Sequence, residues 1–292
     1  MFYVINDEYN SMCGVITSIY SYYACGNKGK VKVYIYSDNY KVVKWFVCSC
    51  KIVSGNRCEI EVRSEAKAKE KWDKYYSGIN KTCIKESYFG ILCEMVGIIC
   101  EQDGWEWHVD CDTLFCGIVR EEVGDVDKGT SVIGSKEVGN WVWSRCHYRV
   151  GIPSRKEYYN CGWILYNCKW FRENKGEIIK GWEEYIGSEG KYDKVCVEQD
   201  YINIVWQRHG NGREIERNGM WIEFNNEVGG EVINHYINKP WRRVSNRYLS
   251  EEKREVEERK AIEYLIVSEE VRKLVGYGYE RFICSVRKGV YI

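Results

Sequence analysis

The chain has 292 residues, of which 45% are hydrophobic and 15% aromatic, enough for a substantial buried core. Its 43 basic and 43 acidic residues cancel, so it lacks the excess positive charge on which nucleic-acid binding usually rests, and no specific nucleic-acid partner is expected. The first seven residues lack the basic region of a signal peptide, and no stretch approaches the roughly 20 apolar residues of a membrane span. We therefore expect a cytoplasmic protein without a transmembrane segment, and leave peripheral membrane association open.

The cysteine content indicates buried thiols rather than a disulfide framework. The fifteen cysteines are an odd number in a long chain, whereas alanine occurs only four times. Cysteine behaves as a small hydrophobic residue when buried, so we expect it to replace alanine in the core. This composition, with six leucines and two prolines, is compatible with a viral or otherwise unusual genome. The cysteines within apolar runs are Cys13, Cys25, Cys93, Cys100, Cys111, Cys161 and Cys168.

Strand and helix patterns alternate along the first hundred residues. Strands are expected at 2–6, 31–36 and 58–62, and apolar residues at helical spacing predict a helix at 12–24. Segment 42–47 fits either a helix or a strand. This alternation is typical of a parallel sheet with crossover helices, so the predicted class is α/β.

The later elements are less regular. A charged helix and loop are expected within 64–87, followed by a largely buried helix at 87–100 that leads into an aromatic strand at 104–109. Ser250 is a suitable N-cap for a solvated helix that runs to about Val275. That helix is expected to pack through Val256, Ile262, Leu265 and Ile266. Between them we expect strands at 132–134, 158–167 and 232–236, helices at 171–186 and 197–206, and an irregular segment at 140–149.

The aromatic strand ends in two aspartates one residue apart, Asp110 and Asp112. In open α/β sheets, ligands bind in the crevice beyond the carboxyl ends of the strands. Carboxylates at this place are suitable oxygen ligands for Mn²⁺ or Mg²⁺, which in turn could bridge a diphosphate. The alternative is an acidic turn without a ligand.

The sequence contains four further motifs besides the D-x-D pair. They are N-D-E-Y at 6–9, Y-Y-N-C-G-W-I-L-Y-N at 158–167, E-Q-D-Y-I-N at 198–203 and H-Y-I-N-K-P-W at 235–241. In this order and spacing, the five motifs resemble glycosyltransferase family 8, the retaining enzymes typified by glycogenin and bacterial lipopolysaccharide galactosyl- and glucosyltransferases. The resemblance covers about residues 2–243.

The resemblance implies a GT-A-type nucleotide-diphospho-sugar transferase fold, with a mixed, mainly parallel sheet flanked by helices. It also implies three parts of the chain. These are a nucleotide-binding half at about 1–116, a sugar and acceptor half at about 117–243, and a helical C-terminal extension at 244–292.

The same resemblance implies roles for individual residues. A Mn²⁺ (or Mg²⁺) cofactor would be held by Asp110, Asp112 and His235, whereas His108 is a competing ligand that we expect to pack in the core. Nucleotide contacts are implied for Asp7, Tyr9, Cys111 and Lys239, with a helix N-cap as the alternative for Asp7. Donor-sugar contacts are implied for Asn160, Gly162, Glu198, Asp200 and Lys85, and catalytic roles for Gln199 and Glu198.

The sequence departs from the family pattern at three places. Glu198 stands where the family has aspartate, Lys85 lies where an arginine is usual, and the spacing between His235 and Lys239 is unusually short. We favour front-face transfer, in which the leaving diphosphate helps to deprotonate the acceptor. A Glu198 nucleophile is the alternative mechanism.

The expected function is transfer of glucose or galactose from a UDP-sugar, with retention, to an acceptor glycan, lipid or protein. Two alternatives stay open, a catalytically inactive UDP-binding protein on the same fold and a nucleotidyltransferase. Nucleotidyltransferases usually carry a glycine-rich, basic loop after the first strand, and segment 6–9 has neither feature.

Overall fold

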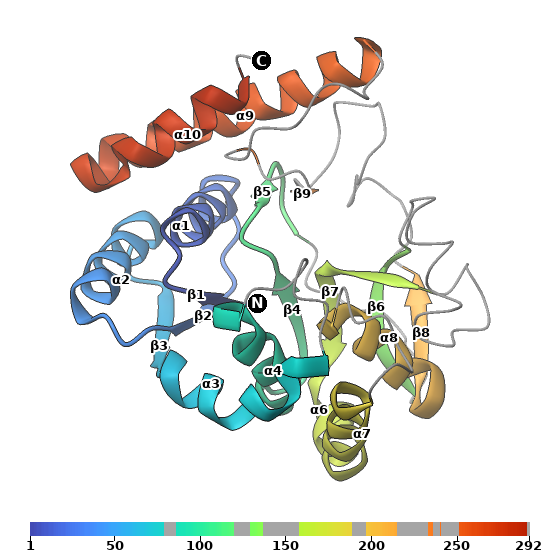
Figure 1. Ribbon diagram of the computed structural model, residues 1–292. Helices are drawn as coiled ribbons and strands as arrows, with labels where there is room; N and C mark the ends of the chain where they lie inside the picture. Colours follow the sequence, from blue (N-terminus) through green and yellow to red (C-terminus); the bar gives the residue numbers. More distant parts are fainter. Residues whose placement is uncertain are drawn as a thin grey trace.

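The computed structural model of the chain describes residues 1–78, 86–119, 129–136, 158–188, 197–214, 233–235, 240 and 251–290. The predictions for the irregular segment at 140–149 and for Lys85, Lys239 and Ser250 fall outside these residues. Within them, the structure is a mixed α/β fold (Figure 1).

Three parallel strands open the main sheet, and the two connecting helices pack on the same face of it. The strands are β1 (Phe2–Asn6), β2 (Val31–Tyr36) and β3 (Cys58–Arg63), and the helices are α1 (Tyr9–Ala24) and α2 (Tyr40–Ser54). The predictions for all three strands and for the first helix are confirmed.

The ambiguous segment 42–47 lies within α2 and is helical. The side chain of Asn39 caps the first turn by accepting a hydrogen bond from the Val42 amide at 3.4 Å. Gly55 ends the helix in the left-handed conformation at φ 60°, which glycine adopts without steric cost. The residues that mark this segment as a helix, Asn39 and Gly55, therefore lie outside its apolar run.

The next part of the chain returns to the centre of the sheet. It contains α3 (Glu65–Trp72), the 3₁₀ helix η1 (Asp73–Gly78), α4 (Glu86–Glu101) and β4 (Trp105–Val109). Helix α4 is apolar along most of its length, as predicted, and it packs on the face of the sheet opposite to α1 and α2 (Figure 1).

The remaining strands of the sheet follow after β4. They are β6 (Thr130–Lys136), β7 (Tyr159–Asn167) and β8 (Asn211–Glu214), with α6 (Cys168–Glu173), α7 (Lys175–Gly187) and α8 (Val197–His209) between β7 and β8. The single helix expected at 171–186 is two helices, because the chain leaves the helical path at Asn174. Strand β8 is not predicted from its polar sequence.

The strand order in the seven-stranded sheet of the described residues is β3-β2-β1-β4-β7-β6-β8. Strand β4 is therefore at the centre, as expected for the strand that ends in the D-x-D pair. Strand β7 runs antiparallel to both its neighbours, β4 and β6, and the other pairs are parallel. The prediction of a mixed, mainly parallel sheet is confirmed.

A second, two-stranded sheet pairs β5 (Thr113–Phe115) with β9 (Ile233–His235). It lies between the main sheet and the C-terminal helices α9 (Glu251–Val275) and α10 (Glu280–Val290), which are joined by η4 (Gly276–Tyr279) (Figure 1). Strand β5 is not predicted from the sequence, whereas α10 lies within the helical C-terminal extension predicted at 244–292. Among the described residues, no helix combines the length and the apolar character of a membrane span.

The packing face of α9 differs from the predicted one. Ile262 and Ile266 are 43% and 59% exposed, so the prediction that they pack against the protein is wrong. Leu265 packs partly buried against the core, as predicted, and the side chain of Val256 lies outside the described part. The buried face instead contains Tyr264 and Val271, which join α1, β5 and α10 in one apolar cluster. The aromatic ring of Tyr264 buries more apolar area than an isoleucine side chain. The helix therefore packs through the face with Tyr264, and Ile262 and Ile266 face away from the core.

The thiols are arranged as predicted, since none of the described cysteines forms a disulfide. Of the seven cysteines predicted in apolar runs, Cys25 and Cys111 are half-buried and the other five are buried.

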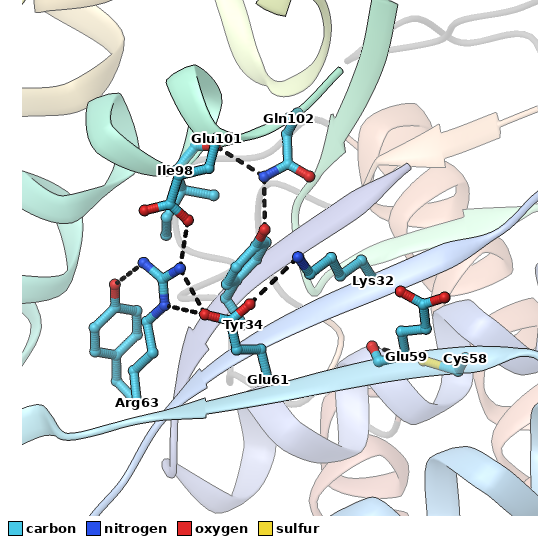
Figure 2. Close-up of polar contacts among 10 residues, drawn as sticks. Lys32, Tyr34, Cys58, Glu59, Glu61, Arg63, Ile98, Glu101 and Gln102 are labelled. Carbon is cyan, nitrogen blue, oxygen red and sulfur yellow. Dashed lines mark hydrogen bonds and ion pairs between the residues drawn. The ribbon is translucent and has the colours of Figure 1, made fainter. Parts of the chain in front are cut away.

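Charged side chains form a series of ion pairs at the edge strand β3 (Figure 2). Glu61 pairs with Lys32 at 3.3 Å and with Arg63 at 2.6 Å, and Arg63 also reaches Glu101 of α4. Gln102, at the end of α4, donates a hydrogen bond to the Tyr34 hydroxyl at 2.6 Å. Charged side chains on an edge strand oppose pairing with another sheet, and here they also fix the end of the helix that leads into β4.

Candidate metal and donor site

Three candidate metal ligands meet beyond the carboxyl end of β4. Asp110 directly follows this strand, and Asp112 directly precedes β5. His235 ends β9 and is the register partner of Thr113 in β5, so the pairing of the two short strands brings His235 beside Asp112. The ligand atoms of the three residues all lie within 4.8 Å of one another.

The cluster is buried on one side and open on the other. The side chains of Asp112 and His235 are 2% and 4% exposed, whereas that of Asp110 is 42% exposed. A small ligand can therefore reach the cluster from the side of Asp110.

The distances and the chemistry of the three side chains fit a divalent cation. His235 Nε2 lies 3.3 Å from Asp112 Oδ1 and 3.6 Å from Asp110 Oδ2. Two ligand atoms that bind one ion at about 2.1 Å and at right angles are about 3 Å apart. Burial alone would lower the pKa of His235, but Asp112 and Asp110 raise it to about 10. Binding of a cation in place of that proton would compensate the same two carboxylates.

Helix α1 and Asn27, shortly after its end, hold the segment that follows Asp112. The Ser21 hydroxyl accepts a hydrogen bond from the Phe115 amide at 3.0 Å. Asn27 accepts from the Val119 amide at 2.8 Å and donates to the Gly117 carbonyl at 3.1 Å. These side chains bind backbone groups at the end of β5 and in the residues that follow it, and they fix the position at which β5 ends.

His108 takes no part in this cluster. Its ring is buried against Phe2, with ring centroids 5.3 Å apart, and its Nδ1 lies 2.8 Å from the Cys161 carbonyl oxygen. A carbonyl only accepts, so Nδ1 carries the proton. Burial lowers the pKa of His108, which favours the neutral ring. The prediction that His108 packs in the core is confirmed.

The first turn of α8 is fastened to β7 through the hydroxyl of Tyr158. This hydroxyl donates to Asp200 Oδ1 at 2.6 Å and accepts from Gln199 Nε2 at 3.1 Å. Gln199 Oε1 in turn accepts from the Cys161 amide at 2.9 Å. The carboxamide of Gln199 is thus held at both ends, and Asp200 is fully buried. Sequence reasoning did not assign a role to Tyr158, although it opens the motif at 158–167.

Asn203, one turn further along α8, binds the backbone at the start of β7. Its Oδ1 accepts from the Tyr159 amide at 2.7 Å, and its Nδ2 donates to the Tyr159 carbonyl at 2.8 Å. The side chain is fully buried and pairs with the backbone as a β-ladder would. We did not assign this role from the sequence, although Asn203 closes the E-Q-D-Y-I-N motif.

Glu198 is half-buried at the start of α8, and its environment favours the protonated form. Burial raises the pKa of this carboxyl to about 7, and the negative charges of Asp110 and Asp200 add to the effect. The electrostatic effect of Asp110 links the start of α8 to the metal cluster.

The predicted nucleotide contacts occupy several positions around β1 and β4. Asp7 follows β1, and its carboxylate accepts from the Ser37 hydroxyl at 2.6 Å, while the N-cap position of α1 belongs to Glu8. The alternative, a helix N-cap at Asp7 or nearby, is met at the adjacent Glu8 and not at Asp7 itself. Cys111 lies between the two aspartates and is half-buried.

Tyr9 is engaged with the C-terminal helices. Its hydroxyl donates to the Gly278 carbonyl at 2.8 Å and accepts from the Phe282 amide at 3.2 Å. Its ring stacks on Trp45, with centroids 5.9 Å apart. These contacts fix the side chain, and its predicted contact with a nucleotide stays a prediction.

The two residues predicted to line the sugar pocket are neighbours on β7. Asn160 is buried, and its Oδ1 accepts from the Gly162 amide at 2.7 Å. Gly162 also accepts from the Asp110 amide through its carbonyl, at 2.8 Å. The structure thus brings Asn160, Gly162 and the start of α8 to the same side of the molecule as the metal cluster. Lys85 and Lys239, with their predicted contacts, lie outside the described residues.

Among the comparisons with known proteins, the one with solved structures finds similar folds. No family model matches the sequence, and no curated protein matches it. Solved structures do match. The galactosyltransferase LgtC, in complex with donor and acceptor sugar analogs, gives a TM-score of 0.56 at 16% identity over 88% of this chain and 95% of its own. Mouse xyloside xylosyltransferase 1 gives 0.54 at 13% identity, over 82% and 97%.

The bifunctional glycosyltransferase WbbM gives a TM-score of 0.59 at 12% identity over 83% of this chain, and the aligned part spans 46% of the length of WbbM. The chain therefore has the GT-A fold that these glycosyltransferases share. The fold class predicted from the sequence motifs is confirmed.

Proposed function

We propose that the protein is a metal-dependent, retaining hexosyltransferase that takes glucose or galactose from a UDP-sugar. The observation that carries this proposal is the convergence of Asp110, Asp112 and His235 beyond the central strand of a GT-A fold. The similarity to LgtC, which was solved with donor and acceptor sugar analogs, supports a nucleotide-sugar donor and a sugar-containing acceptor.

The metal cluster would bind Mn²⁺ or Mg²⁺ through its two carboxylates and its imidazole. Such an ion, when bound, supplies positive charge that stabilises the diphosphate as it leaves. Asp7, Tyr9, Cys111 and Lys239 are the proposed nucleotide contacts. The exposure of Asp110 supports this assignment, because it leaves the cluster open to a diphosphate on that side.

The start of α8 would orient the donor sugar. Gln199 is rigid, since both ends of its carboxamide are hydrogen-bonded, and such preorganisation suits a group that stabilises developing charge. Glu198, Asp200, Asn160, Gly162 and Lys85 are the proposed contacts with sugar hydroxyls.

The state of Glu198 bears on the mechanism. With a pKa of about 7, this carboxyl is half protonated at neutral pH, and the protonated form donates a hydrogen bond but cannot attack. We favour front-face transfer with Glu198 as a ligand of a sugar hydroxyl; a Glu198 nucleophile, the alternative, would act through the ionised half. The acceptor, a glycan, lipid or protein, is not specified by the described residues.

Release of UDP from a panel of UDP-sugars, with and without Mn²⁺ and with no acceptor added, tests the proposal. Slow hydrolysis of UDP-glucose or UDP-galactose that requires Mn²⁺ is the expected result. Mn²⁺-dependent UDP binding without hydrolysis or transfer would support an inactive, nucleotide-binding relative instead. The absence of both binding and hydrolysis would overturn the proposal.

A further inference from the structure

Gly162 lies directly against the ring of His235. A Cβ built on Gly162 would be 2.2 Å from His235 Cε1, 2.7 Å from Nε2 and 2.9 Å from Nδ1. All three nearest atoms thus belong to one side chain, and that side chain is a candidate metal ligand. Gly134, on the neighbouring strand β6, would place its Cβ no closer than 3.2 Å to any atom.

The backbone of Gly162 also contacts the second candidate ligand. Its carbonyl oxygen accepts the hydrogen bond from the Asp110 amide, immediately beyond the last register pair of β4 and β7, Val109 with Trp163. Its own amide donates to Asn160. One residue of β7 therefore touches two of the three members of the metal cluster.

We infer that Gly162 is a positioning residue, whose missing side chain provides the space that the His235 ring needs to reach Asp110 and Asp112. The inference deepens the proposed function, because it assumes that the cluster binds the metal proposed above. It also gives Gly162 a task distinct from the predicted contact with the donor sugar.

A methyl group added at Gly162 would displace the His235 ring rather than the backbone of either strand. Gly162 is not among the glycines with positive φ, so alanine suits its backbone. The β9 backbone is paired with β5 and resists displacement, whereas the imidazole is the end of a side chain and can rotate. The added methyl group would thus turn the ring away from the carboxylates, and the sheet would stay intact.

Binding of Mn²⁺ alone, measured by electron paramagnetic resonance without nucleotide, tests this inference. Gly162→Ala should weaken Mn²⁺ affinity by at least about 10-fold, the range typical for residues that orient metal ligands. Gly97→Ala is the control, because a Cβ at Gly97 meets nothing within 4 Å, and it should bind as the unaltered protein does.

A double-substitution cycle separates an effect through His235 from a general one. If Gly162 acts through the ring, Gly162→Ala in the His235→Ala background should cause no further loss of Mn²⁺ affinity. Should Gly162→Ala alone fail to fold, the double variant should fold, because the clashing ring is gone. Additive losses, or a double variant that also fails to fold, would overturn the inference.

The readouts distinguish failure of this inference from failure of the proposed function. Unchanged Mn²⁺ affinity in Gly162→Ala, with clear binding by the unaltered protein, overturns the positioning role alone. No Mn²⁺ binding by the unaltered protein overturns the proposed metal. In that case the NMR resonances of the His235 ring decide the steric claim, which requires them to shift in Gly162→Ala and not in Gly97→Ala.

Discussion

The start of α8 and the metal cluster hold their polar side chains in two different ways. Around Tyr158, Gln199 and Asp200, the hydrogen bonds are 2.6 to 3.1 Å long and connect protein groups to one another. In the cluster, the contacts of His235 Nε2 with the carboxylates are 3.3 and 3.6 Å, longer than ordinary hydrogen bonds. The protein alone fixes the first region, whereas the second is spaced for a cation. Substitutions should therefore cost stability in the first and metal binding in the second.

The largest expected effect is on activity, in Asp110→Asn. Loss of one ligand should lower Mn²⁺-dependent UDP release by more than about 100-fold, since even residues that only orient ligands cost 10- to 100-fold. The side chain is partly exposed and the amide is isosteric, so the melting temperature without metal should change little. UDP release and thermal unfolding, followed by circular dichroism, measure the two effects. Full turnover of this variant would show that the metal assignment is wrong.

Asn203→Ala should have the largest effect on stability. It removes the two hydrogen bonds that the Asn203 side chain makes with the amide and carbonyl of Tyr159, at a cost of about 2–4 kcal/mol in the free energy of unfolding. Urea denaturation measures this change, and Mn²⁺ affinity of the folded fraction should stay the same. A stable variant with weakened metal binding would remove the distinction between the two regions.

Tyr158→Phe sharpens the comparison, because it removes only the hydroxyl that links Gln199 and Asp200. We expect a loss of about 1–2 kcal/mol in unfolding free energy. Turnover should fall through kcat with Mn²⁺ affinity unchanged, because the carboxamide loses one of its two anchors. Steady-state kinetics with the preferred donor separates this from a change in KM, and an unchanged kcat would contradict the role given to Gln199.

A further effect concerns the pH dependence of stability in the metal-free protein. Glu198 has a folded-state pKa of about 7, above the ordinary value of 4.5, so the folded state keeps a proton that the unfolded state has lost between these values. Stability should therefore fall as pH rises from about 4.5 to 7.

Glu198→Gln cannot ionise, so it should be more stable than the unaltered protein at pH 8 and nearly equal to it at pH 4. Urea denaturation across this range, with the exposed Glu183→Gln on α7 as the matched control, measures the difference. Parallel pH profiles for both variants would contradict the account of Glu198.

Much of the first half of the fold is predictable from the sequence, because its signals are local. Strands β1, β2 and β3 are alternating or apolar runs that end in polar or turn-forming residues. Strand β5 could not be predicted in this way. It has only three residues, and its partner β9 lies more than a hundred residues further along the chain. The prediction for the α9 face was wrong because the helix buries Tyr264 in the core and leaves Ile262 and Ile266 exposed.

The site also contains residues that the sequence predicts and contacts that it does not. The D-x-D pair and His235 follow from motif order, and the structure brings them together. The contact of Gly162 with the His235 ring could not be predicted, because it depends on how closely β7 and β9 approach in space. The roles of Tyr158 and Asn203 likewise depend on how α8 packs against β7. The predicted contacts of Asp7, Tyr9 and Cys111 stay predictions.

The most direct test of the central claim is anomalous diffraction from crystals grown with Mn²⁺ and UDP. The account predicts one strong anomalous peak between the side chains of Asp110, Asp112 and His235, with the UDP diphosphate on the open side at Asp110. A Mn²⁺ peak bound elsewhere, or UDP bound with no metal at these three residues, would contradict it.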